Sequence, residues 1–151
     1  TGNTGGTGST GSTGPTGTTL VLTEAPADLA YTGITVSMTY GESIVAGAPV
    51  YFDATGVVLN ADANAAGKFP AMGMAMETAS SGSHVVLLHG IYRNDSLYAF
   101  TVGGVVYLSI TVGTVTQTQP TTTDHVIRVA GFAMTADELY FNPSSDYTTH
   151  T

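Results

Sequence analysis

Two tyrosines on either side of a short polar run could bind a sugar. Tyr92 and Tyr98 flank residues 93–96, which include Asn94 and Asp95. Aromatic rings offer an apolar face on which a sugar can stack, and amide and carboxylate groups can bond its hydroxyls. We therefore expect a glycan contact at Tyr92, Asn94, Asp95 and Tyr98. The more ordinary interpretation, which stays open, is a hairpin whose aromatic side chains pack against each other across the strands.

The four histidines are not spaced as a metal site. His84 and His89 are five residues apart, so on one continuous strand their side chains face opposite sides. His89 lies in an apolar run, and we expect it to be a core or interface residue. The alternative is a metal held by three copies of His89 or His125 around a threefold axis. Apart from that alternative, we expect no metal and no cofactor.

Patterns typical of enzymes are missing from the sequence. The chain has no cysteine, and it has neither a Gly-x-Ser-x-Gly motif nor a Gly-x-x-x-x-Gly-Lys phosphate loop. The acidic residues are scattered, whereas glycoside hydrolysis needs two carboxyl groups that face each other across a cleft. Asp62 lies among alternating oxygen-bearing residues but lacks the glycine and distal glutamate of a calcium-binding loop, so we expect a solvated loop there. We predict that the protein is not an enzyme, and a polysaccharide depolymerase is the disfavoured alternative.

The chain is acidic and sparsely charged. Of its 151 residues three are basic and eleven are acidic, which gives a net charge of −8, and charged residues make up only 9%. Nucleic-acid binding requires clustered Lys and Arg, and an anionic membrane surface would repel this chain. No run approaches the ~18 apolar residues of a membrane-spanning helix. We therefore expect neither nucleic acid nor a membrane as a partner.

Short β-strands are expected to position these side chains. Residues 34–40 alternate between apolar and polar types, which is typical of a half-buried strand, and clusters of Gly, Asn, Asp and Ser separate further apolar runs. Strands are expected at residues 20–22, 34–40, 49–53, 71–76, 84–92, 97–102, 105–111, 126–134 and 138–141. One short helical turn capped by Thr135 fits the sequence as well. The spacing predicts an all-β domain over residues 20–151, a β-sandwich or jelly-roll-like knob.

This domain contains an internal repeat. Residues 47–76 match residues 103–134, with an offset that grows from 56 residues (47 to 103) to 58 residues (71 to 129). Each copy ends on a strand with a central glycine, Gly73 in the first and Gly131 in the second. A glycine inside a strand usually marks a bulge or a close backbone approach. We expect two related β-units with pseudo-twofold symmetry, and chance similarity is the alternative.

Glycine occupies every third position at the start of the chain. The glycines of this pattern are Gly2, Gly5, Gly8, Gly11, Gly14 and Gly17. Three polyproline-like chains can coil about one axis only where every third residue lacks a side chain, so residues 1–19 predict a collagen-like triple-helical stalk and a homotrimer. A flexible Gly/Ser/Thr linker is the alternative.

The stalk is too short and too poor in proline to hold three chains together alone. The domain that follows it must therefore provide a trimer seam. The residues expected in this seam are Leu20, Leu22, Ile34, Val36 and Met38.

Several segments of the domain carry a common set of marks. The marks are recurring glycines, a strand that ends on Leu108-Ser109, and the run Phe141-Asn142-Pro143. The segments are residues 47–64, 71–76, 85–94, 103–109, 116–120 and 140–144. They resemble a β-domain that recurs in tailed-bacteriophage virion proteins, including head-decoration, head-fibre and tail-fibre proteins. The resemblance covers roughly residues 41–144, and it implies a trimeric β-sandwich or jelly-roll without enzymatic activity.

We therefore predict a homotrimeric structural protein on the virion surface, a fibre or decoration protein whose collagen-like stalk carries a β-knob. Its expected partners are other capsid or tail proteins, bound through a segment upstream of Thr1, and host surface glycans. The stalk also resembles bacterial spore-surface collagen-like proteins. The alternatives are thus a receptor- or glycan-binding tip of a tail fibre and a bacterial surface collagen-like protein.

Overall fold

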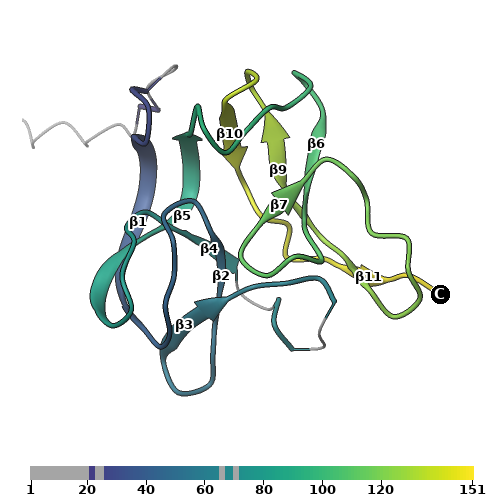
Figure 1. The fold of residues 1–151 in the computed structure, drawn as a ribbon, viewed down its shortest axis with the longest axis horizontal. Coiled ribbons are helices and arrows are strands. Elements are labelled where there is room, and N and C mark those ends of the chain that lie inside the picture. Colours follow the sequence, from purple (N-terminus) through teal and green to yellow (C-terminus); the bar gives the residue numbers. More distant parts are fainter. Residues whose placement is uncertain (1–20, 23–25, 65–66, 70–71) are drawn as a thin grey trace, which may run out of the picture.

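A computed structural model describes residues 21–22, 26–64, 67–69 and 72–151, and these residues form strands and loops (Figure 1). The strands are β1 (Tyr31–Tyr40), β2 (Pro49–Phe52), β3 (Val57–Asn60), β4 (Met72–Ala75), β5 (Gly82–Arg93), β6 (Val105–Leu108), β7 (Val115–Thr116), β8 (Val126–Ile127), β9 (Val129–Ala133), β10 (Glu138–Phe141) and β11 (Thr148–Thr149). No helix occurs in this part of the chain, so the all-β prediction is confirmed there. Accordingly, it holds no helix long and apolar enough to cross a membrane.

The triplet segment lies outside the described residues. The predictions that fall on it are the stalk over residues 1–19, its axis glycines Gly2, Gly5, Gly8, Gly11, Gly14 and Gly17, and the seam residue Leu20.

Nine strands form one continuous sheet, where a sandwich of two sheets was expected. The order is β1-β3-β2-β4-β5-β10-β9-β6-β7, and β1 also pairs with β5. β1 runs parallel to β3 and antiparallel to β5, so the first five strands close into a small barrel. Closure removes the free edges that β1 and β5 would otherwise expose.

The interior of the barrel is an apolar core. It is filled by fully buried side chains that include Val50, Val58 and Val86. A side chain at Gly73 would overlap that of Val86. The central glycine of β4 is therefore required by the close approach of β5 inside the barrel.

The two halves of the sequence repeat have the same strand pairings. In the first, β2 lies between β3 and β4; in the second, β6 lies between β7 and β9. Val50 pairs with Gly73, and the equivalent Val106 pairs with Gly131. β5 and β10 pair with each other where the two halves meet, and Figure 1 shows the first half in purple to teal and the second in green to yellow.

A second apolar cluster joins the two halves. Met72 and Met74 project from β4 into this cluster, on the face opposite the barrel interior, and they meet Leu139 and Phe141 of β10. Both faces of β4 are thus buried, which fits its unbroken apolar sequence.

Two local predictions are wrong. Residues 97–102 were expected to form a strand, but they form a turn and an irregular segment. No helical turn forms after Thr135, whose hydroxyl instead accepts a hydrogen bond of 3.3 Å from the Asp137 N–H in a bend. β1 also begins three residues before the expected start at Ile34, because Tyr31 already pairs with Tyr92 of β5.

Candidate functional site

The tyrosines of the expected glycan contact are core residues. Tyr92 is fully buried and Tyr98 is only 5% exposed. Their rings meet edge to face with centroids 6.0 Å apart, and Tyr98 stacks on Phe100. Burial raises the pKa of both phenols. Neither ring offers a free face to a sugar, so the structure argues against a glycan contact at this place.

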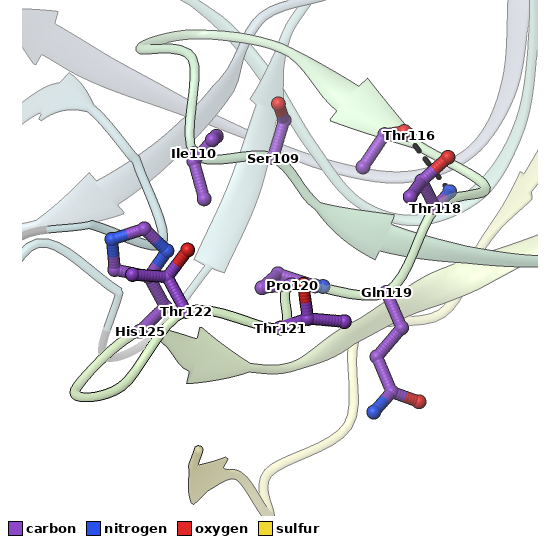
Figure 2. A pocket seen from close by; sticks show the side chains of 9 residues that line it. All are labelled: Ser109, Ile110, Thr116, Thr118, Gln119, Pro120, Thr121, Thr122 and His125. Carbon is purple, nitrogen blue, oxygen red and sulfur yellow. Dashed lines mark hydrogen bonds between the residues drawn. The ribbon is translucent and has the colours of Figure 1, made fainter. Parts of the chain in front are cut away.

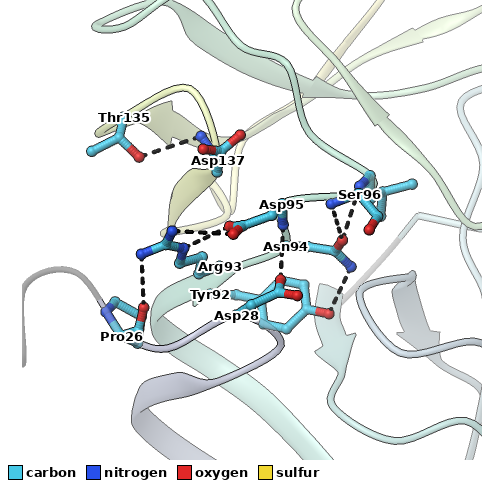
Figure 3. A network of polar contacts seen from close by, with 10 residues as sticks. Pro26, Asp28, Tyr92, Arg93, Asn94, Asp95, Ser96, Thr135 and Asp137 are labelled. Carbon is cyan, nitrogen blue, oxygen red and sulfur yellow. Dashed lines mark hydrogen bonds and ion pairs between the residues drawn. The ribbon is translucent and has the colours of Figure 1, made fainter.

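Asn94 shapes the chain after β5. Its Oδ1 accepts hydrogen bonds from the N–H groups of Ser96 (3.1 Å) and Leu97 (2.9 Å), and its Nδ2 donates to the Tyr92 hydroxyl (Figure 3). A side chain that bonds backbone N–H groups two and three residues ahead favours a turn over a strand. Asn94 is itself buried, so its role is structural.

Asp95 ties the segment that enters β1 to the end of β5. Its carboxylate accepts hydrogen bonds from Arg93 Nε (2.6 Å) and Nη2 (3.1 Å), and its N–H donates to Asp28 (Figure 3). Arg93 also donates to the Pro26 carbonyl oxygen. The bonds from the Arg93 guanidinium hold the pKa of Asp95 below its usual value. Of the four residues expected to contact a glycan, Asp95 alone is exposed, and its carboxylate is engaged in the bonds with Arg93.

The expected trimer-seam residues separate into two groups. Val36 and Met38 pack against the barrel core, and Leu22 is half-buried. Ile34 alternates with Val36 and Met38 on the same face of β1, but it is 49% exposed. Among the seam residues that the structure describes, Ile34 is thus the one most available to another molecule.

Ile34 lies at one end of a row of side chains that crosses five strands, which we call the sheet-face row. The row consists of Val105 on β6, Phe132 on β9, Tyr140 on β10, His89 on β5 and Ile34 on β1. Val105 pairs with Phe132, Phe132 pairs with Tyr140, and His89 pairs with Ile34. Cross-strand partners project from the same face of a sheet.

Direct contacts hold this row together. The rings of Phe132 and Tyr140 lie 5.0 Å apart, and the Tyr140 hydroxyl is 2.9 Å from His89 Nε2. Val105 and Phe132 are 43% and 44% exposed. His89, expected to be a core or interface residue, is half-buried and bonded within this row.

A pocket of about 280 Å³ lies in the second half, between the end of β6, β7 and the loop that leads to β8 (Figure 2). Four threonine side chains line its wall, and Ser109, Ile110, Gln119, Pro120 and His125 complete it. Sequence analysis named residues 116–120 for the family resemblance and His125 as a possible metal ligand, but it expected no ligand pocket in this loop. Its only signal was the density of Thr and Gln over residues 114–123.

Within one chain, the described acidic and histidine residues do not assemble a metal centre. In the part of the chain that the structure describes, no three His, Asp or Glu side chains are grouped as metal ligands. Asp62, expected in a solvated loop, is buried and lies 3.5 Å from Lys68 Nζ. His89 and His125 belong to different parts of the fold, the sheet-face row and the threonine-lined pocket.

The family model for phage cement proteins matches residues 17–90, just under half of the chain. The match starts at the last glycine triplet and contains β1 to β4 and most of β5, which is the closed barrel. Neither a curated protein nor a solved structure matches the chain. The similarity to phage cement proteins places this chain in the phage virion, as a structural protein of the particle.

Proposed function

We propose that the protein is a homotrimeric decoration protein on the exterior of the phage particle, in which three β-knobs are carried by a collagen-like stalk. The observation that carries the proposal is the glycine at every third position from Gly2 to Gly17. This phase has a physical reason only if three chains coil together, because only then is every third side chain excluded from an axis.

The sheet-face row, which lies in the β-domain, also supports the proposal. Single exposed apolar residues are normal on soluble proteins, whereas contiguous exposed apolar rows mark interaction surfaces. The row ends on β1, the first strand after the triplets, and includes Ile34 from the seam expected in the sequence. We assign the row to contacts between the three copies, which would keep the weak stalk in register.

The family match supports a role in holding the particle together. A cement protein is a structural component and needs no chemistry, which agrees with the missing catalytic motifs. We propose that the trimer binds other virion proteins through the end that carries the stalk and presents its acidic knobs outward. A bacterial surface collagen-like protein is less well supported, because the family match is to a phage protein.

Light scattering on the intact chain in dilute solution tests the proposal. The expected mass is three times the 15.4 kDa of one chain. A single-chain mass together with a folded β-domain, seen as a cooperative thermal transition, would contradict it. An assay for reducing sugar released from host polysaccharide addresses the enzymatic alternative, and we expect no release.

A further inference from the structure

The threonine-lined pocket is built from segments that local hydrogen bonds hold in place. The Ser109 hydroxyl accepts from the Thr111 N–H at 3.0 Å, and the Thr116 hydroxyl accepts from the Thr118 N–H at 3.0 Å. The His125 N–H donates to the Thr122 carbonyl oxygen at 3.1 Å. These turns fix the wall before any ligand arrives, so a ligand would lose little affinity to the ordering of loops.

The pocket offers hydrogen-bonding groups that the chain itself does not use. Within the described residues, the hydroxyls of Thr118, Thr121 and Thr122 have no hydrogen-bond partner, although all three line the pocket (Figure 2). His125 Nδ1 is buried and also lacks a partner in this part of the structure. A buried polar atom without a partner is unfavourable, but protein atoms cover His125 Nδ1, so the three threonine hydroxyls are the groups that a ligand in the pocket can bond.

The chemistry of the wall selects the class of ligand. No charged side chain lines the pocket, and the net charge of −8 disfavours anions further. A threonine hydroxyl both donates and accepts. Hydroxyl groups on a ligand match every one of these partners, while Ile110 and Pro120 provide apolar contact for its C–H groups.

We propose that this pocket binds one neutral sugar ring, such as the terminal hexose or N-acetylhexosamine of a surface glycan. The volume of about 280 Å³ lies just below the usual range for ligand pockets, which fits a single ring and not a longer chain. The sugar site is thus on the loop before β8, and not at Tyr92 and Tyr98. The proposal does not depend on the trimer, since all of its residues belong to one chain.

Saturation-transfer NMR on the intact chain tests the pocket with methyl glycosides of neutral hexoses and N-acetylhexosamines. Glucuronic acid serves as the anionic comparison. We expect transfer to at least one neutral glycoside with millimolar affinity, and none to glucuronic acid. If no neutral glycoside shows transfer, or if glucuronic acid shows stronger transfer than the neutral glycosides, the proposal is overturned.

Variants locate the binding. Thr122→Val removes a lining hydroxyl at nearly constant shape and should weaken binding about five- to tenfold, the effect of one hydrogen bond. Thr123→Val, at the exposed neighbour that does not line the pocket, should leave binding unchanged. Asp95→Ala, at the place expected from the sequence, should also leave it unchanged. Equal weakening by the two threonine variants, or loss of binding in Asp95→Ala, would contradict the assignment.

Discussion

Replacing Phe132 by serine should dissociate the proposed trimer and leave the β-domain folded. Phe132 lies in the middle of the sheet-face row, between Val105 and Tyr140, and it is 44% exposed in the single chain. Its exposed part does not contribute to the core. The substitution therefore acts on contacts between copies more than on the stability of one domain.

The exposed fraction sets the size of the effect. A phenylalanine buries about 200 Å² when fully covered, so 44% corresponds to about 90 Å², or about 2 kcal/mol per chain at ~25 cal/mol per Å². Three copies then lose about 6 kcal/mol per trimer. The midpoint concentration of a monomer–trimer equilibrium varies as the square root of the dissociation constant, so it should rise by about two orders of magnitude.

Sedimentation velocity over a dilution series measures this midpoint. Val102→Ser is the matched control, because Val102 is 64% exposed but lies in the turn before β6 and outside the row. We expect the control to assemble like the parent chain. Circular dichroism and a thermal transition verify that Phe132→Ser is folded. An unchanged midpoint in folded Phe132→Ser would refute the role of the sheet-face row.

Three further predictions concern stability. Gly131→Ala should lower the unfolding free energy, measured by chemical denaturation, by more than about 3 kcal/mol, because the new Cβ would overlap the backbone of β10. Gly56 has a positive φ but open space around it, so the control variant Gly56→Ala should cost only about 1 kcal/mol. Equal costs would contradict the close approach of β10 to Gly131. The hydrogen bond that His84 Nδ1 donates to the Glu77 carboxylate raises the pKa of His84. This pair therefore stabilises the fold below the ordinary histidine pKa of about 6.5, and its contribution is lost as pH rises through the raised value. Glu77→Gln should flatten the decline in stability between about pH 6 and pH 8, and an unaltered slope would count against the pair. Asn94→Ala should cost about 2–3 kcal/mol in thermal or chemical unfolding, because two backbone N–H groups and a buried phenol lose their partner, and a loss below about 0.5 kcal/mol would show that Asn94 does not set the turn.

The positions of most strands could be predicted, because their signal is local. Residues 34–40 alternate in type, and glycine-centred runs recur in both halves of the repeat. The closure of the barrel could not be predicted in the same way. It depends on the pairing of β1 with β5 and with β3, and no local pattern encodes which distant strand is the partner.

The glycan prediction shows where spacing alone is insufficient. Aromatic residues that flank a polar run are equally compatible with a binding surface and with a buried corner. What decides between them is Asn94, whose side chain turns the chain back and directs Tyr98 into the core next to Tyr92. The same turn explains why residues 97–102 do not form the expected strand. Burial of this kind follows from tertiary contacts that the sequence pattern does not contain.

An electron cryo-microscopy map of the intact phage particle tests the trimeric account most directly. The account predicts threefold density on the exterior, in which three β-domains turn the faces that carry Ile34, His89 and Phe132 toward the common axis and a thin stalk joins them to the particle. A single β-domain attached alone, or three domains that turn this face to solvent, would contradict it.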